Sequence, residues 1–117
     1  MVYDITNRES FEECKNYYNI KLKEKCKKDI KVILLGNKTD LEDQRKVSSE
    51  EGAGFSLEND YIFMETSCLQ NKNVASAFET LIELTNREEQ KKQVKKKNFQ
   101  LKEEKSKKNK CLCPLFN

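Results

Sequence analysis

The stretch IKVILLGNKTD, residues 30–40, decides how this chain is organised. Its first six residues include five apolar side chains, several of them β-branched, in a run too short for a helix. Such a run predicts a strand buried on both faces, which is typical of a parallel sheet. Ligands of parallel sheets bind at the loops that follow the carboxyl ends of the strands. GNKTD, residues 36–40, is expected to be such a loop.

The residues before this strand predict a shorter strand and then a helix. VYDI, residues 2–5, is the strand, and Thr6-Asn-Arg-Glu9 matches a capping box, in which a hydroxyl and a carboxylate bond the first free amides of a helix. The helix has apolar side chains three and four residues apart, which places them on one face: Phe11, Cys14, Tyr18 and Leu22.

The residues after GNKTD repeat this alternation. Residues 40–47 predict a loop, and Ser48-Ser-Glu-Glu51 is a second capping box at the start of a second helix. That helix contains Gly52 and Gly54, each of which costs about 1 kcal/mol relative to Ala.

Tyr61–Met64 predicts a third strand, and Asn73 predicts the cap of a third helix that reaches about Gln93. Its apolar face holds Val74, Ala77, Phe78, Leu81, Ile82 and Thr85. The order predicts an α/β domain over residues 1–93, with three parallel strands alternating with three helices. From about Val94 the chain is Lys-rich and poor in apolar residues, which predicts a disordered basic tail over residues 94–117.

Charge separates an acidic body from a basic tail. Residues 91–110 hold ten Lys and two Glu, whereas residues 1–90 hold 13 Lys or Arg against 18 Asp or Glu. The N-terminal VYDITNRESF has no basic segment before an apolar run, so no signal peptide is predicted. The five Cys are therefore expected to be free thiols in a reducing compartment. No metal site is predicted, because the chain has no His and no CxxC pair.

GNKTD offers three side chains that suit a purine base. Asp40 can accept two hydrogen bonds side by side, and guanine, unlike adenine, presents two neighbouring donors. Lys38 can lay its apolar stem over a base while its ammonium stays in water. Asn37 can both donate and accept hydrogen bonds and so fasten neighbouring loops. On these five residues alone, a polar loop without a ligand is the alternative.

A second loop, ETSCL at residues 65–69, follows the third predicted strand. Together with GNKTD, VYDITNRESF at residues 2–11 and a basic tail that ends in two cysteines, it makes the chain resemble the Rab family of small GTPases of the Ras superfamily. The resemblance covers the C-terminal half of that family's P-loop NTPase fold. It implies a guanine site made of Asn37, Lys38, Asp40, Ser67, Cys68 and Leu69.

Within that site the resemblance implies a role for each residue. Asp40 would select guanine, and the backbone amide of Cys68 would meet the guanine oxygen. Leu69 stands where the family usually has Lys, so a polar contact would be lost there. Of the others, Lys38 would pack on the base, Asn37 would brace the site and Ser67 would hold the second loop.

The motifs that bind phosphate are absent from these 117 residues. GxxxxGK(S/T) cradles phosphates with its backbone amides and binds Mg²⁺ with its hydroxyl, but none of the three Gly has that spacing. The DxxG segment, which the family needs for Mg²⁺ and the attacking water, is also absent, because no Asp is followed by Gly three residues later. We therefore expect weak GTP or GDP binding, no catalytic residue and no hydrolysis by this chain alone, with Mg²⁺ bound only in a longer form. Without the family's first strand, Val2–Ile5 would be an unpaired apolar edge and the domain marginally stable.

Cys111-Leu-Cys113 resembles the paired cysteines that carry prenyl groups in Rab proteins. A prenyl chain beside a polybasic segment gives stable membrane anchoring. The chain departs from the usual family ending, because Pro-Leu-Phe-Asn follows Cys113 and Pro114 stands where a CaaX box needs Cys. A solvated charge run or a nuclear-localisation patch is the alternative interpretation.

The resemblance implies part of a GTP-dependent switch in vesicle traffic, on the cytoplasmic face of intracellular membranes with a cytosolic pool. Its partners would be guanine nucleotide, the membrane, a Rab escort protein, a dissociation inhibitor, exchange factors, activating proteins and effectors. The alternative is a short, non-catalytic, membrane-associated interaction protein derived from a Rab. Nucleic-acid binding is disfavoured, because Phe99 is the lone aromatic residue among the Lys of the tail.

Overall fold

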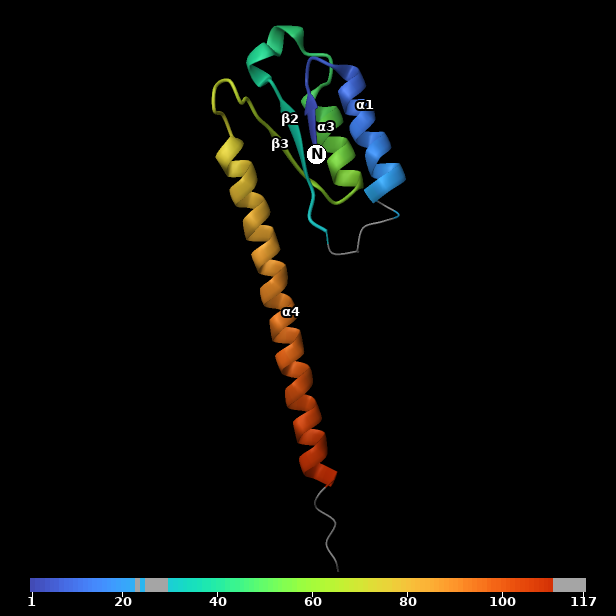
Figure 1. The fold of residues 1–117 in the computed structure, drawn as a ribbon, viewed down its shortest axis with the longest axis vertical. Helices are drawn as coiled ribbons and strands as arrows, with labels where there is room; N and C mark the ends of the chain where they lie inside the picture. The colour runs from blue at the N-terminus through green and yellow to red at the C-terminus, as the bar shows by residue number, and fades with distance from the viewer. Residues whose placement is uncertain (23, 25–29, 111–117) are drawn as a thin grey trace, which may run out of the picture. The chain divides into compact units, whose positions relative to one another are not determined.

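The computed structural model describes residues 1–22, 24 and 30–110, which form two compact units that divide between Ile82 and Glu83. The first unit contains a sheet of three parallel strands: β1 (Val2–Asp4), β2 (Ile33–Asn37) and β3 (Ile62–Glu65). The strands lie side by side in the order of the sequence (Figure 1). The predicted fold of parallel strands alternating with helices is confirmed.

Helices connect the strands and follow the last one: α1 (Arg8–Tyr17), α3 (Ser49–Glu58) and α4 (Val74–Lys110). A π-helical turn, Tyr18–Leu22, continues α1, and a 3-10 helix, Thr39–Gln44, follows β2. The 3-10 helix occupies most of the segment that the sequence predicted to be an irregular loop. Figure 1 shows α1 next to α3; α1 packs against β1, and α3 packs against β2 and β3.

The core lies between the sheet and these two helices. Alternate residues of the first strand, Tyr3 and Ile5, point into it together with Phe11 of α1. The rings of Tyr3 and Phe11 are tilted against each other with their centroids 4.8 Å apart. The Tyr3 hydroxyl has no hydrogen-bond partner among the described residues, and burial, with a smaller contribution from Glu65, raises its pKa to about 12.

The two predicted capping boxes have different outcomes. The second is confirmed: the Ser48 hydroxyl accepts the amide of Glu51 at 3.1 Å, and the Glu51 carboxylate accepts the amide of Ser48 at 3.0 Å. The first is wrong, because the cap of α1 is Asn7, whose side chain accepts two amides of the first turn. Thr6 lies one residue before this cap position, and its hydroxyl donates to Asp4 at 2.6 Å.

Side chains of α1 cover the outer edge of β1. Met1 and Ile5 bond the backbone of β2, so the alternate residues Val2 and Asp4 turn their backbone groups outward. The amide of Asp4 donates to the Ser10 hydroxyl at 3.0 Å, and the Cys14 thiol donates to the carbonyl of Val2 at 3.4 Å. The prediction of an unpaired edge is therefore corrected in part: among the described residues no further strand lies beside β1, but side chains of α1 bond its backbone.

Helix α4 is longer than the sequence analysis expected. The prediction ended it near Gln93 with disorder beyond, whereas the structure continues it to Lys110. Residues 74–110 contain no Gly or Pro and are rich in Lys, Glu and Gln, which favour helix. The domain boundary at residue 93 stays a prediction, and residues 111–117 with both terminal cysteines lie outside the described residues.

Candidate functional site

The two loops predicted to bind a base lie next to each other at the carboxyl ends of β2 and β3. The amide of Thr66 donates to the carbonyl of Gly36 at 2.8 Å, which extends the pairing of the strands by one step. The amide of Thr39 in turn donates to the carbonyl of Thr66 at 3.2 Å. These backbone bonds bring GNKTD and ETSCL together, because parallel neighbours end at the same edge of a sheet.

Asn37 ties the second loop to the first. Its side-chain oxygen accepts the Thr66 hydroxyl at 3.2 Å and the backbone amide of Cys68 at 3.3 Å. Thr66 is almost fully buried, whereas Cys68 is exposed. The amide of Cys68 therefore lies at the surface with its position fixed by a side chain of the neighbouring loop.

Asp40 is held by one of its two carboxylate oxygens. The Ser67 hydroxyl donates to Asp40 Oδ1 at 2.5 Å, and Ser67 is completely buried. The same hydroxyl oxygen accepts the amide of Gln70 at 3.1 Å, so its orientation is fixed from both sides. Asp40 Oδ2 has no hydrogen bond within the described part of the chain. The carboxylate is thus oriented and keeps acceptor capacity for two neighbouring donors.

Lys38 separates Asn37 from the 3-10 helix and has a left-handed backbone, with φ of 69°. Its ammonium pairs with Asp4 Oδ2 at 2.6 Å. Partial burial raises the pKa of Asp4, but the bonds from Lys38 and Thr6 outweigh it and leave that pKa below its usual value. The same bond to Asp4, with the charge of Asp40 adding to it, raises the pKa of Lys38.

The tip of the second loop faces solvent. Leu69 is 83% exposed, so its side chain is available to a ligand or partner. An antiparallel bridge between Ser67 and Lys72 closes the loop. Asn73 was predicted to cap α4 with its side chain, but that side chain donates to the carbonyl of Glu65 at 2.9 Å and fastens the loop to β3 instead.

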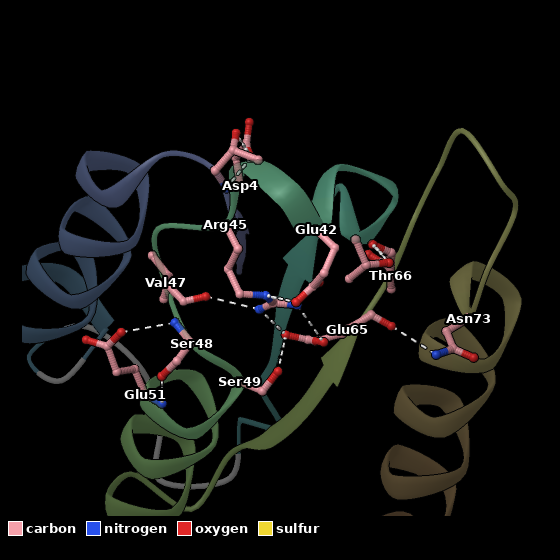
Figure 2. A network of polar contacts seen from close by, with 12 residues as sticks. Asp4, Glu42, Arg45, Val47, Ser48, Ser49, Glu51, Glu65, Thr66 and Asn73 are labelled. Carbon is pink, nitrogen blue, oxygen red and sulfur yellow. Dashed lines mark hydrogen bonds and ion pairs between the residues drawn. The ribbon is translucent and has the colours of Figure 1, made fainter.

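A network of charged groups fixes the end of β3, from which the second loop, residues 65–69, continues. Figure 2 shows Arg45 between the carboxylates of Glu65 and Glu42. Its guanidinium donates two hydrogen bonds to Glu65, at 2.7 and 3.2 Å, and two to Glu42, both at 2.7 Å. Ser49, at the start of α3, also donates to Glu65, at 2.7 Å. Glu65 is the last residue of β3, so the network fixes the strand end from which Thr66 continues.

The structure therefore joins four of the six predicted site residues, through the bonds of Asn37 with Cys68 and of Asp40 with Ser67. Lys38 and Leu69 adjoin them in the two loops, but the Lys38 ammonium pairs with Asp4 and the Leu69 side chain faces solvent. Sequence reasoning missed four neighbours that hold them: Asp4, Thr39, Arg45 and Thr66. Thr66 was inside a recognised motif and could have been found from it. Asp4 carried no local signal, because its place beside Asn37 follows from the register of β1 on β2.

The six site residues do not line the apolar groove of the first unit. This groove has a volume of about 480 Å³ and is lined mostly by apolar residues of β1, β2, the end of α1 and the first turns of α4, with none of the six site residues. Within the described residues, no cluster of three or more His, Cys, Asp or Glu is placed to hold a metal ion. No described helix combines the length and apolar character needed to cross a bilayer.

The sequence of this chain is similar to those of known proteins. Over 82 residues the chain is 44% identical to the putative Ras-related protein RABA4e of Arabidopsis thaliana, covering 70% of this chain and 46% of that protein. Over 81 residues it is 43% identical to Ras-related protein Rab-8A of Bos taurus, covering 69% of this chain and 39% of that protein. The chain thus spans less than half the length of these relatives. A family model described as the Ras family matches residues 1–87, and the chain therefore belongs to the Ras family.

Proposed function

We propose that this chain is the guanine-recognition part of a Rab-like small GTPase that acts in vesicle traffic. One observation carries the proposal: Asp40 is oriented by the buried Ser67 and keeps a carboxylate oxygen without a partner in the described structure. Beside it, Asn37 fixes the amide of Cys68 at the surface. The site thus offers neighbouring acceptors to the ring N–H and exocyclic amine of guanine. The amide of Cys68, which donates to Asn37 at 3.3 Å in this structure, would exchange that bond for one to the guanine carbonyl when the base binds.

The residues present fit a guanine base better than a whole nucleotide. The six site residues supply acceptors, a backbone donor and apolar contact for the base, but GxxxxGK(S/T), which would cradle the phosphates, does not occur in residues 1–117. Mg²⁺ likewise lacks its hydroxyl and carboxylate ligands in this sequence. We therefore propose that residues 1–117 bind GTP and GDP mainly through the base and do not hydrolyse GTP.

Titration with guanosine, followed by NMR of the backbone amides, tests the site without involving phosphate. We expect saturable shifts at Cys68 and Asn37 with guanosine and none with adenosine. Asp40→Ala should weaken guanosine binding by about tenfold or more, because a charge-assisted pair of hydrogen bonds is lost. Asp43→Ala is the matched control, since it removes an exposed carboxylate of the same 3-10 helix and should leave binding unchanged.

Two results would contradict this proposal. Equal shifts with guanosine and adenosine would mean that Asp40 does not select the base. Phosphate release from GTP above the solvent rate, abolished by Asp40→Ala, would show that residues 1–117 carry catalytic machinery.

We further propose that the basic tail anchors the protein to membranes through prenylated Cys111 and Cys113. The support is the density of Lys over residues 91–110, directly before the two cysteines. In cells expressing the chain, we expect prenylated tail peptides in the membrane fraction. Replacing both cysteines by Ser should move most of the protein to the soluble fraction, since the Lys segment alone binds anionic surfaces reversibly. Unmodified thiols throughout the membrane fraction would refute prenylation.

A further inference from the structure

We propose that Asp4 is a positioning residue of the guanine site: it holds the Lys38 ammonium away from Asp40, so that the guanine-selecting carboxylate stays free. The inference rests on the proposed function of the site. It adds a residue of another strand that was not among the six assigned to that site.

The register of the sheet places Asp4 beside the first loop. Asp4 is the last residue of β1 and lies opposite Asn37, the last residue of β2. Lys38 is the next residue, and its ammonium reaches back over the strand ends to Asp4 Oδ2 at 2.6 Å. The side chain of Asp4 is 21% exposed and that of Lys38 is 52% exposed, so the pair lies at the surface with its acidic member the better shielded.

Asp4 is a fixed anchor because its own carboxylate is bound on the other side. Asp4 Oδ1 accepts the amide of Thr6 at 2.8 Å and the Thr6 hydroxyl at 2.6 Å. The backbone amide of Asp4 is also bound, to Ser10 of α1. The ammonium of Lys38 therefore pairs with a group that is held by three bonds to its surroundings, which limits the entropy lost on pairing.

Two carboxylates compete for this ammonium. Asp4 is in direct contact with it, and Asp40, two residues further along the chain, also acts on Lys38 electrostatically. Asp40 Oδ2 is the oxygen without a partner in the described structure, so it is an acceptor with which a released ammonium would pair. A Lys38–Asp40 pair would occupy the acceptor that the guanine donors need. By holding Lys38, Asp4 keeps that acceptor available and the Lys38 stem in one direction.

A double-mutant cycle separates this role from a general structural one. Asp4→Asn keeps a side-chain oxygen for Thr6 but removes the negative charge that holds Lys38. We expect it to weaken guanosine binding about three- to tenfold. In a Lys38→Met background no ammonium can reach Asp40, and there Asp4→Asn should leave guanosine affinity unchanged. Equal weakening in both backgrounds, or none in either, would overturn the proposal.

A second measurement does not depend on guanosine binding. In the Asp4→Asn variant, nuclear Overhauser contacts are expected to appear between the ε-protons of Lys38 and the β-protons of Asp40, and they should be absent from the wild-type chain. If these contacts fail to appear, Asp4 does not hold the Lys38 ammonium away from Asp40, and the proposal is wrong. If they appear while the wild-type chain does not bind guanosine, the positioning role stands and the proposed function fails.

Discussion

Gly52→Ala is expected to destabilise the first unit by about 1–3 kcal/mol, although Ala is the better helix former. Gly52 lies in α3 where the helix meets the sheet. A β-carbon there would lie 2.5 Å from Cε2 of Phe63 and 2.6 Å from the Tyr3 hydroxyl oxygen. Both rings belong to the core or pack against it, so neither can move aside without disturbing its neighbours.

Gly54 of the same helix provides the matched control. A β-carbon at Gly54 would have no atom within 4 Å, so Gly54→Ala should stabilise the unit by about 0.5–1 kcal/mol through helix propensity alone. Urea unfolding followed by circular dichroism measures both variants against the wild-type chain. A Gly52→Ala variant as stable as Gly54→Ala would mean that α3 does not approach the sheet this closely.

Arg45→Ala is expected to cost about 2–3 kcal/mol of stability, because it leaves a partly buried carboxylate without its partner. The side chains of Arg45 and Glu65 are 16% and 24% exposed, so their bonds are poorly screened by water. Because Glu65 precedes Thr66, the variant should also loosen the loop that carries Ser67 and Cys68. Urea unfolding gives the stability change, and guanosine titration should show weaker binding.

Arg8→Ala is the control for this prediction. Arg8 also pairs with a carboxylate of α3, that of Glu51, but their side chains are 46% and 40% exposed. Such a surface pair contributes about 0–1 kcal/mol, so the two Arg variants should differ clearly. Equal losses from both would show that the Arg45 network contributes no more than an ordinary surface ion pair.

The parts of the fold that local patterns determine could be predicted from the sequence. The apolar run at residues 30–35 predicted a buried strand; its second half begins β2, whereas residues 30–32 precede the strand and Ile30 is 49% exposed. The strand itself is Ile33–Asn37, because Gly36 and Asn37 pair with β1 and Gly36 also with β3. The Ser48 capping box also follows from local chemistry, since both partners lie within four residues.

The contacts that depend on register could not be predicted in this way. Asp4 meets Lys38, and Arg45 meets Glu65, across segments that lie far apart in the sequence. The contact of the Thr6 hydroxyl with Asp4 of the strand, and the start of α1 at Arg8 with Asn7 as its cap, were likewise not predicted. The local capping-box pattern pointed to Thr6 and missed Asn7.

Because side chains of α1 already bond the backbone of β1, a strand that added to this edge would replace existing hydrogen bonds and would not simply form new ones. An incoming strand would have to replace the bonds that Ser10 and Cys14 make with the backbone of β1, so few hydrogen bonds would be gained in total. The net driving force would then come from apolar contact, with Val2, which is 59% exposed, and the groove beside it. The edge thus discriminates against polar strands that could pair by backbone alone, and it admits those that also bring apolar side chains.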